Sequence, residues 1–207
     1  MTQLMTEPAP VAPLHAVDPV RSQRRIELAV AELLAALGRD IDDEHLADTP
    51  RRVTAGLAEM LTPIEFAMTT FPNDEGYRDL VLVRDIPFVS LCRHHLLPFR
   101  GIAHIGYLPA ERLVGLSKLA RTLDSFSRDL QVQERLTRQV AEFLAEELEP
   151  RGVGVVIEAE HLCMSARGAR SVGSTTVTST FLGELAADPS AQSRFLGGQS
   201  LRGRSDG

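Results

Sequence analysis

The sequence has no tryptophan, only two cysteines and, among 22 basic residues, a single lysine. It also has no apolar run near the roughly 20 residues that a membrane-spanning helix needs. Its first residues, MTQLMTEPAPVAPLHAVDPV, lack the basic stretch followed by an apolar stretch that is typical of a secretory signal. Without export, two thiols are expected to stay reduced, so we expect a cytoplasmic protein without a disulfide.

An excess of positive charge is also missing. The chain has 28 acidic residues against 22 basic ones, a formal net charge of −6. General affinity for nucleic acid or for an anionic membrane surface is therefore not expected. With 43% hydrophobic and 24% charged residues over 207 positions, the composition is typical of one compact globular domain.

Hydrophobic spacing predicts alternating groups of helices and strands. Helices are expected at 20–38, within 47–61 with Thr49 as a cap, from about 117, within 132–152 and at 188–196. Strands are expected at 79–91, 99–109, 153–164 and 173–183, and residues 62–78 are expected to form a loop. Pro87 indicates an edge strand or a bulge. This order predicts an α+β fold with an antiparallel sheet.

The expected boundaries are those of a single domain over 20–197. Residues 20–62 would form N-terminal helices, and residues 79–197 would form the core. The tails at 1–19 and 198–207 are rich in small and polar residues or proline and are predicted to be disordered.

The stretch SLCRHHLLPF, residues 90–99, holds a cysteine and two adjacent histidines. Cys92 and His95 have the C-x-x-H spacing with which a turn can direct two side chains to one metal ion. His161 and Cys163 lie two positions apart at the end of the expected strand 153–164, where residues i and i+2 share a face. We expect the two pairs to meet around one ion.

Other interpretations of this cluster remain open. A buried cysteine is often only a small hydrophobic residue, and Cys163 alone would indicate no more than that. A structural zinc site would use four protein ligands, whereas a catalytic site would use three and leave a position for water. Surplus histidines favour the catalytic case, because imidazole transfers protons near neutral pH.

Several charged residues point to a possible substrate. Gln133 and Glu134 stand at the start of a predicted helix, where a glutamate could accept two hydrogens from the edge of a base such as guanine. Cationic side chains that could clamp a polyphosphate are Lys118, Arg121, Arg167, Arg170 and Arg52. Each of these residues alone is more often a solvated charge, and Glu134 also suits a helix N-terminus for electrostatic reasons.

Taken together, the motifs DTPRRV, CRHHLLPF, HIGYLP, GLSKLAR, QVQERLT, HLCM, ARG and TVTSTFLG resemble GTP cyclohydrolase I from about Asp48 to Leu196. The resemblance implies the tunnelling fold, a four-stranded antiparallel sheet with paired helices and an N-terminal helical extension. It also implies a ring-forming barrel, with two pentamers stacked into a homodecamer and active sites between subunits. The implied reaction converts GTP and water to 7,8-dihydroneopterin triphosphate and formate, the first step of tetrahydrofolate and pterin biosynthesis.

The resemblance also implies a role for each motif residue. Zn²⁺ would be held by Cys92, His95 and Cys163, with water in the fourth position, and His94 and His161 would carry protons. Gln133 and Glu134 would hold guanine. The triphosphate and ribose side would be lined by Ser117, Lys118, Arg121, Arg167 and Arg52, some of them from a neighbouring subunit.

Two positions depart from the family pattern. Arg93 stands where the usual motif, Cys-Glu-His-His, has a glutamate, and Ala55 stands where bacterial relatives often have a lysine. One alternative is therefore a specialised or low-activity relative that binds GTP or a pterin for a deazapurine route or for regulation. Another is a tunnelling-fold nitrile reductase with a cysteine nucleophile and no zinc, which the second cysteine and the histidine cluster disfavour.

Overall fold

The computed structural model describes residues 19–197, which fall into two compact units, one ending at Glu59 and the other beginning at Met60. The tails predicted to be disordered lie outside the described residues, apart from Pro19, which begins a helix. The predicted boundaries of a single domain stay a prediction. No helix within the described residues is both long and apolar enough to cross a membrane.

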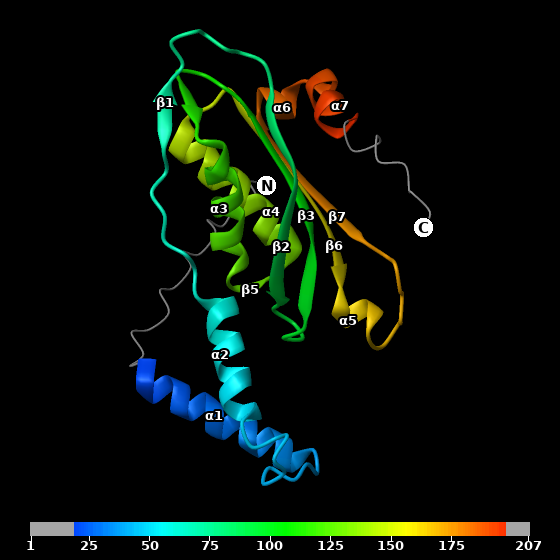
Figure 1. Cartoon of the computed structure of the whole chain (residues 1–207). Helices are drawn as coiled ribbons and strands as arrows, with labels where there is room; N and C mark the ends of the chain where they lie inside the picture. The colour runs from blue at the N-terminus through cyan, green and yellow to red at the C-terminus, as the bar shows by residue number, and fades with distance from the viewer. Residues whose placement is uncertain (1–18, 198–207) are drawn as a thin grey trace, which may run out of the picture. The chain divides into compact units, whose positions relative to one another are not determined.

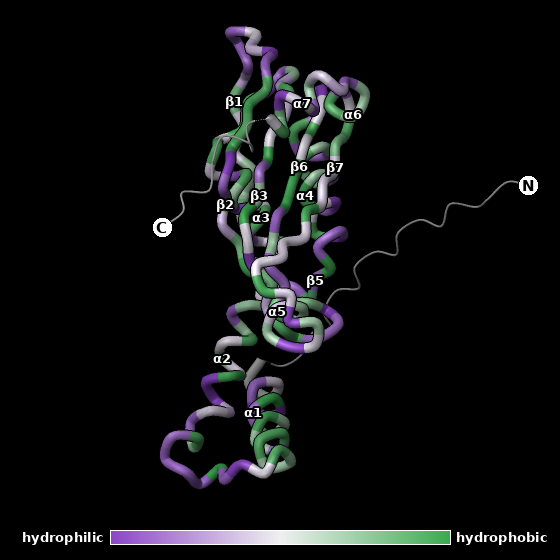
Figure 2. Tube along the Cα trace, turned by 90° about the vertical axis from the view of Figure 1, so that its right-hand side faces the viewer, coloured by the Kyte–Doolittle hydropathy of each residue, from purple (hydrophilic) through white to green (hydrophobic). Residues whose placement is uncertain are grey.

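The first unit is helical. Helix α1 spans Pro19–Ala36, and the next helix, α2, spans Thr49–Leu61 and continues into the second unit. The chain leaves α1 at Gly38, whose φ of 73° is a left-handed conformation that glycine adopts without strain. Hydrophobic residues run along α1 (Figure 2), and two of them, Leu28 and Leu33, are 61% and 57% exposed. The two helices predicted in this region are confirmed.

The second unit is built on a five-stranded sheet with the order β5-β2-β3-β6-β7. Its four long strands are antiparallel: β2 (Val81–Cys92), β3 (Pro98–Leu108), β6 (Gly152–His161) and β7 (Thr176–Gly183). The short β5 (Leu130–Gln131) pairs in parallel with the last two residues of β2. The α+β class and the antiparallel sheet are therefore confirmed.

Helices α3 (Leu116–Ser127) and α4 (Gln133–Leu148) cover one face of this sheet (Figure 1). The core lies between these layers, where Ala103, Ile105 and Tyr107 alternate along β3 and are at most 1% exposed. Alternation with period two directs these three side chains to the helices. The strand predicted at 99–109 is thus confirmed, and this face of it is buried.

Strand β2 is irregular where proline was expected to disturb it. The register between β2 and β3 shifts between Val83 and Ile86, and Asp85 has a φ of 55°. Among residues 19–197, the other side of β2 is paired only at Leu91 and Cys92. Pro87 therefore lies in a strand that has both a bulge and a largely open edge, as its lack of an N–H requires.

The second face of the sheet is covered locally by α7 (Pro189–Gly197), which follows the short helix α6 (Glu184–Ala187). Phe195 of α7 is fully buried above Gly106 and Gly154, which oppose each other on β3 and β6. A Cβ at Gly154 would lie 2.7 Å from the Phe195 ring, so this contact requires glycine.

The structure corrects the sequence-based prediction at several short elements. The expected loop 62–78 contains β1 (Thr70–Pro72), which pairs with another unpredicted strand, β4 (Arg112–Val114). Strand β5 and helix α6 were also not predicted. The expected strand 153–164 ends at His161, and Cys163 lies in the short helix α5 (Leu162–Ser165). His161 and Cys163 therefore do not share a strand face, and that prediction is wrong.

Candidate metal and catalytic site

A tight turn after β2 brings the first two predicted metal ligands together. The N–H of Cys92 donates to the carbonyl of Leu97 at 2.8 Å, and the carbonyl of Cys92 accepts from the N–H groups of His95 and Leu96 at 3.2 and 2.8 Å. Leu96 takes a left-handed φ of 55° to close the turn. As a result, the Cys92 Sγ lies 3.5 Å from Nδ1 of His95.

The third predicted ligand, Cys163, lies much later in the chain, after α4 and β6. Helix α5 places Cys163 so that one ligand atom from each of Cys92, His95 and Cys163 lies within 4.8 Å of the others. Cys92 is buried, Cys163 is half-buried and His95 is exposed. Burial raises the pKa of the Cys163 thiol, and the neighbouring Cys92 raises it further. A bound cation would favour the ionised form of the Cys163 thiol and so oppose both effects.

The two remaining histidines lie outside this trio. Nδ1 of His94 is 4.0 Å from the Cys92 Sγ. Nε2 of His161 is 2.7 Å from Oε1 of Gln133, and its ring stacks on Phe99 with 4.6 Å between centroids and 3° between planes. Burial lowers the pKa of His161, while the charge of Glu134 opposes that effect.

All five of these cysteine and histidine side chains line one cavity of about 220 Å³, together with Gln133 and Glu134. Glu134 is exposed in the first turn of α4, whereas Gln133 is only 2% exposed. A larger hollow of about 630 Å³ lies at the opposite end of the sheet, beside α6 and α7, and none of the cluster residues lines it.

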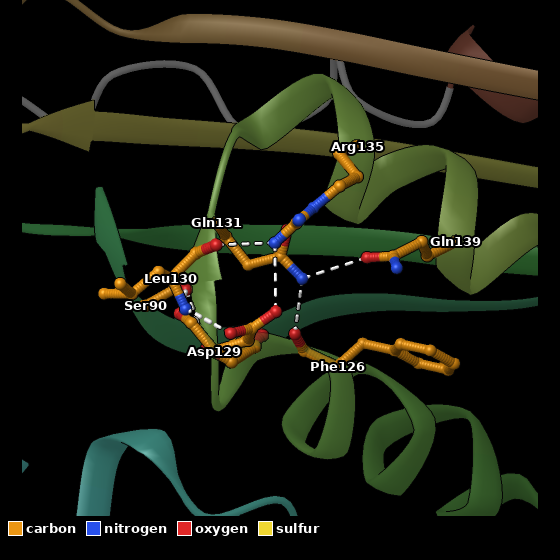
Figure 3. Close-up of polar contacts among 8 residues, drawn as sticks. Ser90, Phe126, Asp129, Leu130, Gln131, Arg135 and Gln139 are labelled. Carbon is orange, nitrogen blue, oxygen red and sulfur yellow. Dashed lines mark hydrogen bonds and ion pairs between the residues drawn. The ribbon is translucent and has the colours of Figure 1, made fainter. Parts of the chain in front are cut away.

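A hydrogen-bond network lies at the start of α4 (Figure 3), and the turn after β2 is bonded to it through Arg93. The N–H of Arg93 donates to the carbonyl of Gln131 in β5 at 2.9 Å. The Gln131 side chain, 1% exposed, donates to the carbonyl of Phe126 at 2.8 Å and accepts from Nε of Arg135 at 2.9 Å. Arg135 also pairs with Asp129 at 3.0 Å. These hydrogen bonds therefore join three segments at one corner: the turn after β2, the end of α3 and the beginning of α4.

Sequence reasoning missed the supporting residues Phe99, Gln131 and Arg135 as contributors to this site. Phe99 lies in the quoted motif CRHHLLPF, and the other two lie in QVQERLT. Motif membership was the available signal. The Phe99 ring stacks on His161, 62 positions away in the chain. The side chains of Gln131 and Arg135 have near neighbours in the chain as partners, but the link to the turn after β2 joins Gln131 to the distant Arg93.

The structure does not bring the predicted phosphate-binding residues to this cavity. Ser117, Lys118 and Arg121 lie in the first half of α3, and none of them lines the cavity. Arg167 follows α5 and is exposed, and its charge partly offsets the raised pKa of Cys163. Arg52 lies in the first unit, paired with Asp48 at 3.1 Å.

Comparison with known proteins gives the family. The family model described as GTP cyclohydrolase I matches residues 26–199. The chain belongs to the GTP cyclohydrolase I family. The tunnelling fold expected for this family agrees with the antiparallel sheet and paired helices described above.

Curated relatives support the same assignment. A "GTP cyclohydrolase 1" of Aquifex aeolicus is 50% identical over 174 residues, covering 84% of this chain and 95% of the relative. Proteins of the same name from Allorhizobium ampelinum and Mycobacterium leprae are 48% and 47% identical, covering 84% and 86% of this chain and 90% and 89% of the relatives.

A solved structure, the archaeosine synthase QueF-Like in the apo form, is more distantly similar. The TM-score is 0.40 at 16% identity, over 50% of this chain and 93% of that chain. Similarity at this level carries no argument about activity.

Proposed function

We propose that this chain is a zinc-dependent hydrolase that converts GTP and water to 7,8-dihydroneopterin triphosphate and formate, as the first step of tetrahydrofolate and pterin biosynthesis. The observation that carries the proposal is one cavity that holds a thiol–imidazole–thiol trio, two further histidines and an acidic residue. This full set, in a member of the GTP cyclohydrolase I family, gives no support to a specialised or inactive relative.

The donor set fits Zn²⁺. Two cysteine sulfurs and one imidazole nitrogen are ligands that zinc prefers, and three protein ligands are typical of catalytic rather than structural sites. Cys92, His95 and Cys163 would hold the ion through atoms that already lie within 4.8 Å of one another. When bound, zinc would polarise a water molecule or a substrate oxygen and so favour hydrolysis at C8 of the purine.

Protons must move when the imidazole ring of GTP opens and formate leaves. His94 and His161 are the candidates for this work, because both line the cavity and neither belongs to the metal-binding trio. Glu134, exposed in the same cavity, would accept the N1 and 2-amino hydrogens of guanine. A carboxylate in this role discriminates against adenine, which has no hydrogen at N1.

The anionic part of GTP needs cations that this cavity does not supply from its own lining. Ser117, Lys118, Arg121, Arg167 and Arg52 are proposed for the triphosphate and ribose. Because Lys118 and Arg121 lie outside the cavity lining, a second copy of the chain is the natural source of these two residues. A site shared between copies agrees with the assembly that we propose, a homodecamer of two pentameric rings. We further propose that the enzyme acts in the cytoplasm.

The deciding experiment is incubation of zinc-supplemented protein with GTP. Formate release and the fluorescence of the oxidised pterin product should appear together, and ATP should give neither product above a small background. Protein that contains zinc but releases no formate from GTP would refute the proposal. Equal turnover of ATP would refute the role of Glu134.

A further inference from the structure

The side chain of Gln133 is fully engaged inside the protein. It is 2% exposed, and its Nε2 lies 3.1 Å from the carbonyl of Ile157, 2.9 Å from the carbonyl of Thr176 and 3.1 Å from Oγ1 of Thr178. Its Oε1 faces Nε2 of His161 at 2.7 Å. An amide nitrogen has two hydrogens, and here three acceptors surround them.

The two backbone carbonyls fix which way round this amide stands. A carbonyl oxygen can only accept a hydrogen bond, so the group that faces Ile157 and Thr176 must be the NH₂ group of Gln133. If the amide were reversed, its oxygen would face two other oxygens without any hydrogen between them. Oε1 is therefore the atom that points at His161.

Two threonine hydroxyl groups agree with this orientation. The hydroxyl of Thr137 donates to the backbone carbonyl of Gln133 at 2.8 Å, so its oxygen must accept in its 2.6 Å contact with Thr178. The hydroxyl of Thr178 then donates its only hydrogen to Thr137, and its oxygen accepts from Nε2 of Gln133. Every hydrogen in this group has one consistent direction.

The same reasoning continues into the His161 ring. Because Oε1 of Gln133 can only accept, Nε2 of His161 must carry the hydrogen. In the neutral ring the lone pair is then on Nδ1, which has no hydrogen-bond partner among residues 19–197. The stacked ring of Phe99 fixes the plane in which that lone pair lies.

We propose that Gln133 is a positioning residue that holds His161 in its Nε2–H tautomer, so that Nδ1 is the ring nitrogen available to the substrate. This inference rests on the proposed function and replaces the guanine-binding role that the family resemblance implied for Gln133. The side chain of Gln133 has no hydrogen left for guanine, so side-chain recognition of the base falls to Glu134 rather than to both residues. Partners of this kind, behind a reacting or ligating histidine, fix its orientation and tautomer.

A spectroscopic measurement tests the tautomer without any turnover. In zinc-loaded protein with ¹⁵N-labelled histidine, the His161 ring should show a protonated Nε2 and an unprotonated Nδ1 at a pH where the ring is neutral. His161→Asn identifies the signals by their loss. In Gln133→Met, which removes both the acceptor and the donors, the single tautomer should give way to a mixture. A wild-type ring with its hydrogen on Nδ1 would overturn the inference.

Kinetics then separates positioning from base binding. Gln133→Met should lower kcat roughly 10- to 100-fold, the usual range for loss of such a supporting partner, with KM for GTP and zinc content nearly unchanged. In a His161→Asn background the same substitution should have little further effect, because the residue it positions is gone. Raised KM with unchanged kcat would instead identify Gln133 as a guanine contact and contradict the proposal.

Gln131→Met is the matched control. Gln131 is equally buried and lies two residues away, but its side chain bonds Phe126, Gln139 and Arg135 rather than a histidine. The double variant Gln131→Met/His161→Asn should therefore lower kcat by the product of the two single-variant factors. If Gln133→Met multiplies in the same way, Gln133 is merely structural and the inference fails. Wild-type protein that releases no formate would refute the proposed function, and the tautomer measurement would still decide this inference.

Discussion

At the scale of single residues, Cys163 is the proposed ligand that joins two distant parts of the chain at the candidate metal site. Replacing Cys163 with Ala leaves one thiol and one imidazole, too few to retain zinc in a site of this kind. We expect both bound zinc and formate release to fall below a tenth of the wild-type value, with zinc measured per chain by mass spectrometry after dialysis. His94→Ala is the control, because His94 lies outside the trio and its loss should leave zinc in place. Retention of stoichiometric zinc in Cys163→Ala would show that the trio is wrong.

His104 on β3 gives a prediction about pH that is independent of the metal. It is 5% exposed, and its Nδ1 accepts the N–H of Asp85 at 3.3 Å. Burial lowers its pKa from 6.5; the nearby charge of Arg84 lowers it further, whereas those of Asp85 and Glu158 oppose the shift. The unfolded chain therefore binds a proton at higher pH than the folded chain. Neutral His104 stabilises the fold fully above about pH 6.5, and this contribution is lost as the pH falls below that value.

The substitution His104→Gln keeps an acceptor at this position but removes the titration. We expect the free energy of unfolding, measured by urea denaturation, to decline less between pH 8 and pH 5 in this variant than in the wild type. Part of the decline should remain, because His161 has a pKa shifted in the same direction. The exposed His45 provides the control, His45→Gln. Equal declines in both variants would mean that His104 contributes nothing to the pH dependence.

At the scale of elements, the corner where α3, β5 and α4 meet depends on Arg135. Its guanidinium group bonds the buried Gln131 amide, the Asp129 carboxylate and the Leu130 carbonyl (Figure 3). Arg135→Met would leave these acceptors without their donor, at a cost of about 1–3 kcal/mol in the free energy of unfolding. Arg138, one turn along the same helix, forms only an exposed ion pair with Glu142 at 2.7 Å.

Arg138→Met is therefore the control for Arg135→Met in the same urea titration, and it should change stability by no more than about 0.5 kcal/mol. The same corner supports the turn after β2, which carries His95, through the bond between Arg93 and Gln131. Arg135→Met should therefore weaken zinc retention as well. Equal costs for the two arginine substitutions would show that the network adds nothing beyond an ordinary surface pair.

The long elements were predictable from the sequence because each has its own periodicity. The apolar alternation of 99–109 and the helical spacing within 132–152 follow from burial of one face, and both appear in the structure as β3 and α4. The pairing of Cys92 with His95 was also predictable, because a three-residue spacing is local. The convergence with Cys163 was expected from the sequence and is found in the structure.

The short elements were not predictable, because a segment of a few residues is too short to have a periodicity of its own. β5 has two residues and no period, and it exists because Gln131 is bonded by side chains from α4 and by the turn after β2. The strand before Cys163 ends earlier than its pattern indicates, since the backbone turns into α5 at Leu162. Likewise, nothing in the sequence separates Gln133 from Glu134, yet one is buried behind His161 and the other is exposed in the cavity. Such differences depend on non-local contacts.

At the scale of the whole molecule, the proposed shared active site can be tested by mixing subunits. His94→Ala removes a residue that lines the cavity, and Arg121→Ala removes one from α3 that does not. Each variant alone should be nearly inactive as a homo-oligomer. If a site takes His94 from one chain and Arg121 from its neighbour, co-expression in equal amounts creates sites that have both residues. About a quarter of the sites should then be intact, and formate release should recover to about a quarter of the wild-type rate.

The control is a mixture of His94→Ala with Cys163→Ala. These two residues line the same cavity of one chain, so every site in the mixture still lacks one of them, and no recovery is expected. Light scattering should show that each preparation has about ten times the 22.7 kDa mass of the chain, because the proposed assembly is two closed rings of five chains. Recovery of formate release in the control mixture, without recovery in the test mixture, would contradict a shared site. Failure of the test mixture to recover, in oligomers of the expected mass, would place Arg121 in the same chain's site or outside any site.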